Sequence, residues 1–176
     1  MKISIITVCY NSDKTIEKTI NSVLDQDYKN IEYIIIDGGS HDNTLNIIDN
    51  YRSKISYKVS EKDTGIYDGI NKGIKKATGD IICLIHANDI FADTNVISKV
   101  VSSFKKNPDF KIILADLAFK KNLNDEKILR YYSAKHFKPW MLKIGYSPPH
   151  LSAFFKIGVF KKVGLYATNF NIAGDF

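Results

Sequence analysis

The feature that most constrains the fold is a repeated alternation of strand-like and helix-like segments in the first half of the chain. Apolar, β-branched runs without a helical period indicate buried strands at residues 3–8, 31–37, 55–59 and 80–85. Apolar residues that recur every three or four positions predict helices at residues 14–26, 42–51 and 66–77. With short connections, this alternation predicts an α/β fold: a mostly parallel sheet with helices on both faces.

The second half of the chain carries a weaker pattern. A helix is expected over residues 95–105 and a strand over 111–116. Residues 118–146 are rich in Lys and Asn without a clear period, which indicates an irregular or antiparallel excursion. A short strand at 151–155 and one or two helical turns at 157–163 follow. Because no repeat, low-complexity tract or linker interrupts the 176 residues, a single domain is expected.

Composition excludes several classes of protein. Hydrophobic residues make up 44% of the chain and charged residues 25%, as in an ordinary globular protein. No run approaches the ~18 consecutive apolar residues of a membrane span, and the apolar N-terminus lacks the small-residue cleavage site of a signal peptide. Cys9 and Cys83 both lie in strand-like runs, which predicts buried thiols and favours a cytoplasmic protein.

The net charge of +6 bears on partners. The lysines are scattered along the sequence and form no long basic run, which argues against nucleic-acid binding. A basic protein also suits anionic small substrates or the anionic inner face of a membrane, because its surface potential raises their local concentration. The sequence leaves both open, peripheral membrane association included.

Polar residues follow each of the four expected strands of the first half. They are Tyr10 and Asn11, then Asp37, then residues 61–63, and finally Asn88 and Asp89. Ligands of open parallel sheets bind beyond the carboxyl ends of the strands. A turn accounts for any one of these sets, but four sets on one edge of one sheet indicate a binding site.

Several motifs, taken together with their order and spacing, resemble the opening of family 2 glycosyltransferases of the GT-A fold. They are IITVCYN (5–11), SVLDQDY (22–28), IDGGSHDNT (36–44), SEKDTGIYD (60–68), NKG (71–73), ATGD (77–80), PH (149–150) and IAGDF (172–176). The resemblance is dense over residues 3–92 and thin over 93–146. It implies a Rossmann-like GT-A domain, with residues 1–92 as the nucleotide-sugar-binding half and 93–176 as a partial acceptor-side half.

The resemblance also implies a reaction: inverting transfer of a sugar from a nucleotide-sugar to a glycan or lipid-linked acceptor. Assembly of cell-surface polysaccharide is the usual setting of such enzymes. The nucleoside is expected to be held by Asp37 and by Thr7 together with Tyr10 and Asn11. Asp37 can accept a hydrogen bond from a uracil N–H, which favours a UDP-sugar; a turn or cap role before Gly38 is the alternative.

Further donor contacts are expected from the segment that follows the third strand. Asp63 is expected near the nucleotide, and Asn71 and Lys72 lie on a helix facing the same edge. Lys72 is a candidate phosphate contact, with a solvated surface lysine as the alternative. Tyr67 and Asp68 are candidates for the donor-sugar side.

Asn88 and Asp89 align with the acidic metal motif of GT-A enzymes. Asp89 is the expected ligand of Mn²⁺ or Mg²⁺, which prefer hard oxygen ligands and bridge to the diphosphate of the donor. This chain departs from the motif because Asn88 replaces the first acid and His86 precedes it. The site therefore has one negative charge fewer, and a plain turn remains the alternative.

The resemblance assigns the catalytic base to Asp175, which would deprotonate the hydroxyl of the acceptor substrate. A frayed terminal residue without a role is the alternative. His150 is expected on the acceptor or diphosphate side, or simply in a turn.

Two competing functions remain. The first is a nucleotide-sugar-binding module with impaired or no transfer, because family members usually continue beyond the base with helices on the acceptor side. Another α/β nucleotide-binding enzyme is the second, although the chain has neither a GxxxxGK[ST] phosphate loop nor a GxGxxG after the first strand. The sequence identifies neither the sugar, the acceptor nor the oligomeric state.

Overall fold

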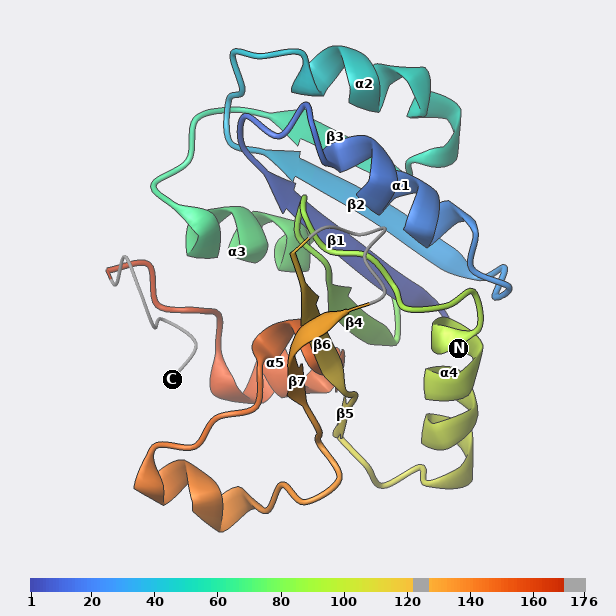
Figure 1. Ribbon diagram of the computed structural model, residues 1–176, viewed down its shortest axis with the longest axis vertical. Coiled ribbons are helices and arrows are strands. Elements are labelled where there is room, and N and C mark those ends of the chain that lie inside the picture. Colours follow the sequence, from blue (N-terminus) through green and yellow to red (C-terminus); the bar gives the residue numbers. More distant parts are fainter. Residues whose placement is uncertain (122–126, 170–176) are drawn as a thin grey trace.

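A computed structural model describes residues 1–121 and 127–169, and its centre is a six-stranded mixed sheet (Figure 1). The strands are β1 (Ile3–Cys9), β2 (Ile31–Asp37), β3 (Tyr57–Ser60), β4 (Ile81–Leu84), β5 (Ile112–Leu114) and β8 (Ala153–Lys156). They lie in the order β3-β2-β1-β4-β8-β5. The first four run parallel, whereas β8 is antiparallel to both of its neighbours. The expected mostly parallel sheet is confirmed.

Helices cover both faces of the sheet, as expected. They are α1 (Ile16–Leu24), α2 (Thr44–Asn50), α3 (Ile66–Lys76), α4 (Val96–Lys106) and α5 (Gly158–Val163). Three short 3-10 helices join them: η1 (Arg52–Lys54), η2 (Pro139–Ile144) and η3 (His150–Ser152). Figure 1 shows α1 over β1 and β2 and α2 at the top of the view beside β3, and the core contacts put both on one side of the sheet and α3 on the other.

Alternation along the strands divides the apolar core into two clusters. On β1, Ile3, Ile5 and Cys9 pack against α1, α2 and α4, whereas Ile6 and Val8 pack against α3. Successive side chains of a strand point to opposite faces, and both faces here are covered by helices. This double burial explains why the strands read as continuous apolar runs.

Some elements differ from the sequence-based expectation. β3 begins at Tyr57, two residues later than predicted, because Arg52–Lys54 form η1 and the buried Ile55 joins the core from a turn. The expected irregular or antiparallel excursion contains an antiparallel hairpin of β6 (Leu117–Lys120) and β7 (Ile128–Tyr132), outside the main sheet. The second half nevertheless contributes β5 and β8 to that sheet, so the described residues form one domain.

The amino edge of the sheet is held by a buried carboxylate. Glu32 accepts hydrogen bonds from Lys2 Nζ at 2.6 Å, Ser4 Oγ at 2.5 Å and the Thr78 backbone N–H at 2.7 Å. Burial alone would raise the pKa of Glu32, but these donors lower it to about 2. They tie β1, β2 and the loop before β4 together, at the end of the sheet opposite the predicted site.

Two general expectations can be compared with the described residues. Cys9 and Cys83 are buried free thiols, as predicted, and burial raises the pKa of both. In the described ranges, no helix has the length and apolar character needed to cross a membrane.

Candidate functional site

The loops that follow β1 and β2 are bound to each other at the carboxyl edge of the sheet. The Asn11 backbone N–H donates to Ser40 Oγ at 2.8 Å, and the His41 N–H donates to Asn11 Oδ1 at 2.9 Å. Asn11 has a φ of 45°, a left-handed conformation that Asn tolerates better than most residues. These bonds hold the chain so that the ring of Tyr10 is 58% exposed at this edge.

Asp37 lies at the end of β2 and is fully buried. Its carboxylate accepts hydrogen bonds from the N–H groups of Gly39 (3.1 Å) and Ser40 (2.9 Å) and from the hydroxyls of Ser40 (2.5 Å) and Ser60 (2.6 Å). Burial opposes its ionisation, but these donors keep the pKa of Asp37 below its usual range. Asp37 therefore stabilises the turn 37–40 and joins it to β3. A contact between Asp37 and a nucleotide stays a prediction.

Asp63 reaches the same edge from the loop after β3. A Cβ placed on Gly38 would lie 2.7 Å from Asp63 Oδ2, and one placed on Gly69 would lie 3.4 Å from the same oxygen. Asp63 Oδ1 accepts a hydrogen bond from the Gly65 N–H at 3.1 Å. The carboxylate thus occupies the space that a side chain at position 38 would need, and it is only partly buried.

Two predicted site residues point away from this edge. Thr7 is fully buried, with its hydroxyl 3.1 Å from the Tyr33 hydroxyl, on the core side that faces α1. Asn71 uses both ends of its side-chain amide on the backbone of Tyr166, at 2.8 Å and 2.9 Å. These contacts give Thr7 and Asn71 structural roles, and nucleotide contacts for them stay predictions.

Lys72 is held in an ion-pair network on α3. Its Nζ lies 3.0 Å from Glu61 Oε1 and 3.3 Å from Asp68 Oδ2. Partial burial works against the charged form, but the two carboxylates raise the pKa of Lys72. A phosphate would compete with Glu61 and Asp68 for this ammonium group, so the predicted phosphate contact requires some rearrangement.

The segment after β4 is a tight turn that is anchored to α1. The N–H groups of Asn88 and Asp89 donate to the His86 carbonyl at 2.8 Å and 3.0 Å, and the Asp89 side chain accepts from the His86 N–H at 3.3 Å. Thr19 Oγ1 on α1 donates to the Asp89 carbonyl at 2.9 Å, and Thr15 Oγ1 donates to the Ala87 carbonyl. Burial raises the pKa of Asp89, whereas the Asn88 side chain is exposed.

His86 begins this turn, and its backbone N–H and carbonyl both bond to Asp89. No role for His86 was predicted from the sequence. Among the described residues, neither of its buried ring nitrogens has a hydrogen-bond partner. Its ring lies 5.8 Å from the ring of His150, centroid to centroid. Burial and then the nearby His150 lower the pKa of His86 to about 4, so it is neutral at physiological pH.

Asn88 and Asp89 could hold a cation only together with a bound ligand. In residues 1–121 and 127–169, no group of three or more His, Cys, Asp and Glu side chains is arranged to hold a metal ion. Mg²⁺ is commonly held by one or two carboxylates together with phosphate oxygens and water. Asp89 offers one carboxylate and Asn88 an amide oxygen. A diphosphate would have to supply most of the remaining ligands.

Strand register brings the remaining candidates to one edge. Cys9 pairs with Asp37 and Asp37 with Ser60, and the Ala87 N–H donates to the Val8 carbonyl at 3.3 Å. Tyr10, Asp63, Asn88 and Asp89 therefore border one surface. Since β1 separates β2 from β4, the carboxyl ends of β2 and β4 are roughly 10 Å apart. Asp175, the predicted base, lies outside the described residues.

The residues that support this edge were not predicted from the sequence. Ser40 was recognised as part of a motif, but its bonds to Asp37 and Asn11 were not foreseen. Ser60 comes from a strand 23 residues further along the chain. An unexplained histidine within an apolar segment was the one signal available for His86.

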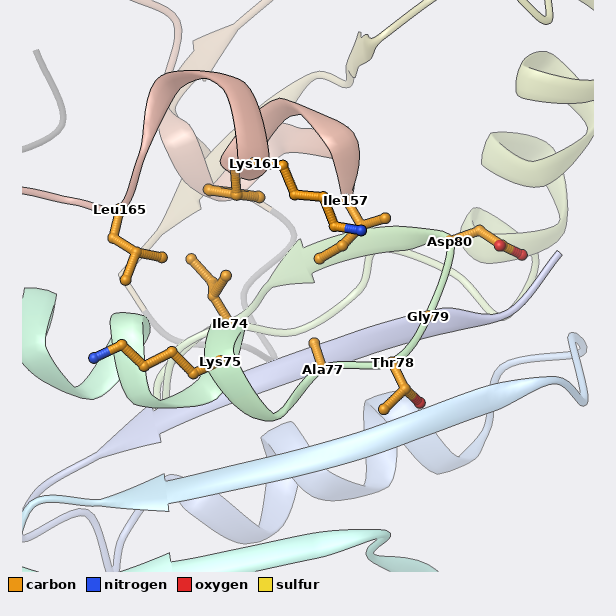
Figure 2. A pocket seen from close by; sticks show the side chains of 10 residues that line it. Ile74, Lys75, Ala77, Thr78, Gly79, Asp80, Ile157, Lys161 and Leu165 are labelled. Carbon is orange, nitrogen blue, oxygen red and sulfur yellow. The ribbon is translucent and has the colours of Figure 1, made fainter.

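A cavity of about 430 Å³ lies at the opposite, amino edge of the sheet (Figure 2). It is bordered by the end of α3, the loop 77–80 and α5, with Ile74, Lys161 and Leu165 among its lining residues. Within residues 1–121 and 127–169, none of the predicted site residues lines it. We therefore treat the carboxyl edge as the candidate site.

Comparison with known sequences agrees with the motifs. Residues 4–163 match the family described as Glycosyl transferase family 2. The uncharacterized glycosyltransferase Rv1514c of Mycobacterium tuberculosis is 30% identical over 175 residues, which cover 98% of this chain and 65% of that protein. The poly(ribitol-phosphate) beta-N-acetylglucosaminyltransferase TarS of Staphylococcus aureus is 35% identical over 94 residues, or 51% of this chain and 16% of that protein. The chain spans about two thirds or less of these relatives.

Solved structures share the fold. The crystal structure of S. aureus TarS in complex with UDP has a TM-score of 0.77 at 22% identity, covering 99% of this chain and 53% of that one. The mannosyltransferase PcManGT from Pyrobaculum calidifontis, in complex with GDP-Man and Mn²⁺, has a TM-score of 0.72 at 16% identity, covering 96% of this chain and 48% of that one. Such likeness identifies a GT-A fold. With the family match over residues 4–163, the chain belongs to glycosyltransferase family 2.

Proposed function

We propose that this glycosyltransferase domain binds a UDP-sugar along the carboxyl edge, with the base near Asp63 and the diphosphate near Asp89. The observation that supports the proposal is that Asp63 lies against Gly38, just after β2, while Asp89 lies in the turn after β4 of the same sheet. The span of roughly 10 Å, two strand spacings, suits a nucleoside diphosphate.

The base contact is assigned to Asp63 because this residue is only partly buried, whereas Asp37 is fully buried. A carboxylate accepts a hydrogen bond from the imide N–H of uracil or the N1–H of guanine. Adenine and cytosine present an unprotonated nitrogen at the matching position, and the lone pair of this nitrogen repels the carboxylate. Asp37 then acts through the shape of the turn 37–40, and the exposed ring of Tyr10 is available to stack on the base.

The choice of UDP over GDP rests on the sequence resemblance and on similarity to TarS, which has been crystallised with UDP. PcManGT, whose structure contains GDP-Man, represents the competing donor class. A GDP-sugar would use the same Asp63 contact with a larger base. Direct comparison of nucleotides therefore belongs in the first experiment.

The diphosphate end would hold Mn²⁺ or Mg²⁺ on Asp89, with the Asn88 oxygen as a neutral second ligand. The cation would neutralise charge on the departing diphosphate. Because Asn88 carries no charge, we expect weak cation binding without a nucleotide. The turn anchored by Thr15 and Thr19 would keep Asp89 in place as the nucleotide binds.

Transfer itself is proposed to be inverting, with Asp175 as the base that takes the proton of the attacking hydroxyl. The acceptor substrate would be a glycan or lipid-linked acceptor in cell-surface polysaccharide synthesis, in keeping with the poly(ribitol-phosphate) in the name of TarS. A nucleotide-sugar-binding module without transfer is the second candidate. It is favoured by the loss of the first acid of the metal motif at Asn88.

A thermal-shift panel tests the donor site. UDP, GDP, ADP and CDP would each be added with and without Mn²⁺. Each nucleotide would be present at about 100 times its dissociation constant. Specific binding at that excess should raise the melting temperature by about 5–10 °C. We expect UDP with Mn²⁺ to give the largest shift. Equal shifts from ADP and UDP would contradict the base assignment, and no shift from any nucleotide would contradict the donor site.

Asp63→Ala should remove the preference for UDP, whereas Asp109→Ala is a matched control, since Asp109 is an exposed carboxylate in the loop after α4. Release of UDP from UDP-sugars then separates the two candidate functions. A transferase should release UDP in the presence of an acceptor, and a binding module should not.

A further inference from the structure

The positive charge of the protein comes from one part of the chain. Residues 1–126 contain 17 Lys and Arg and 18 Asp and Glu, so they are close to neutral. Residues 127–174 contain eight Lys and Arg and no Asp or Glu. The lysines look scattered along the sequence, but their uncompensated charge is confined to residues 127–174. This segment therefore carries the attraction to anionic partners.

Exposed apolar side chains gather in the same part of the chain. η2 contains no buried residue, and Trp140, Leu142 and Ile144 on it are 54%, 53% and 71% exposed. Tyr146 directly after it is 40% exposed, and Leu129 on β7 is 60% exposed. Figure 1 shows this orange helical turn at the lower margin, outside the sheet and the helices that cover it. A short segment with this many exposed apolar side chains is a candidate interaction surface.

The combination of residue types selects the partner. Tryptophan prefers the boundary between lipid and water, and Lys side chains can cover apolar surface while their ammonium groups remain in water. Lys138 and Lys143 flank or interrupt the apolar residues of η2, and Lys135 precedes them. Nucleic acid would pair with the lysines but would not bury Leu142 and Ile144. An anionic bilayer satisfies both kinds of side chain.

We propose that residues 127–146 dock the domain onto an anionic lipid bilayer, with η2 inserted at the headgroup level. Such docking would bring the domain to a lipid-linked acceptor substrate. The inference does not rest on the donor site, because vesicle binding is measured without nucleotide. Either proposal can fail while the other stands.

The chain contains one tryptophan, Trp140, which makes it a direct reporter. Fluorescence would be followed as vesicles of phosphatidylcholine, with or without phosphatidylglycerol, are added to the 176-residue chain. We expect a blue shift with phosphatidylglycerol vesicles, quenching by lipids brominated near the headgroup, and loss of both at high salt. Co-sedimentation with the same vesicles gives the affinity.

Two variants separate charge from apolar insertion. Lys138→Gln with Lys143→Gln should weaken binding on the order of 30-fold, from the attraction of two charges near the surface. Leu142→Ser with Ile144→Ser should reduce the blue shift and the affinity in the same assay. Phe110→Ser is the matched control, because Phe110 is 52% exposed but lies in the loop before β5. It should bind as the parent does.

Several results would overturn the proposal. Equal binding to vesicles with and without phosphatidylglycerol would show that charge does not drive docking. Absence of binding to either kind would contradict docking itself. Emission already blue-shifted without lipid, and unchanged on dilution, would mean that protein covers Trp140. A blue shift that disappears on dilution would instead assign this surface to a second copy of the chain.

Discussion

Moving one carboxylate across the candidate site tests the assignment of the nucleotide base. Asp63 Oδ2 lies 2.7 Å from where a Cβ on Gly38 would be. Gly38 has no positive φ, so space and not backbone conformation requires glycine at this position. A side chain at 38 should therefore be tolerated once Asp63 is shortened, and Gly38→Asp would then return a carboxylate to nearly the same place.

The expected magnitudes follow from these contacts. Asp63→Ala removes a charged hydrogen-bond acceptor worth about 1.5–3 kcal/mol, which weakens UDP binding by roughly 10- to 150-fold. Gly38→Asp alone forces two carboxylates together and should destabilise the fold by about 1–3 kcal/mol. The double variant, Gly38→Asp with Asp63→Ala, relieves the overlap and should recover most of both losses.

Calorimetric titration with UDP and Mn²⁺ gives the three affinities, and urea unfolding gives the three stabilities. The double variant Gly38→Ala with Asp63→Ala is the control, because it fills the space without a charge. Recovery that appears only with aspartate at 38 supports a carboxylate–base contact. The reasoning is refuted if Asp63→Ala binds UDP as tightly as the parent, or if the control recovers binding equally well.

Three further predictions concern other parts of the chain. Asp89→Ala should abolish the Mn²⁺ dependence of UDP binding, and Asn88→Asp should strengthen it by adding a second carboxylate; a weaker cation effect in Asn88→Asp would make this segment a plain turn. Glu32→Gln should cost about 2 kcal/mol at neutral pH in urea unfolding, allowing for partial solvent screening. Since the pKa of Glu32 is lowered from 4.5 to about 2, its contribution to the free energy of unfolding is full above pH 4.5 and is lost as the pH falls toward 2. The difference in stability between the parent and Glu32→Gln should shrink over this range, and a difference that stays constant would contradict the prediction. Asp175→Asn should leave UDP binding intact and lower transfer by about 10²–10⁴-fold, and full transfer in this variant would assign the base elsewhere.

Local sequence patterns predicted most of the parallel sheet. The apolar runs of β1, β2 and β4 and the periodic helices α1, α3 and α4 lie within a few residues of their expected positions. The position of β8 was not predictable in this way. Its four residues pair with β4, some 70 positions earlier, and with β5, and a short apolar run does not identify its partner strands.

The candidate site was predicted as a set of positions but not as a set of contacts. The Asp37 carboxylate is committed to Ser40 and Ser60, and the second of these partners is remote in sequence. Thr7 had a local signal that was overlooked. It shares the face of Ile5 and Cys9 on β1, so strand alternation directs it into the core.

The most direct measurement is a crystal structure of the chain with UDP and Mn²⁺, using the anomalous signal of manganese to locate the cation. We expect manganese against Asp89 and the diphosphate, with the uracil imide N–H directed at Asp63. UDP bound instead in the cavity bordered by Ile74 and Lys161 at the amino edge, or manganese away from Asp89, would contradict this expectation.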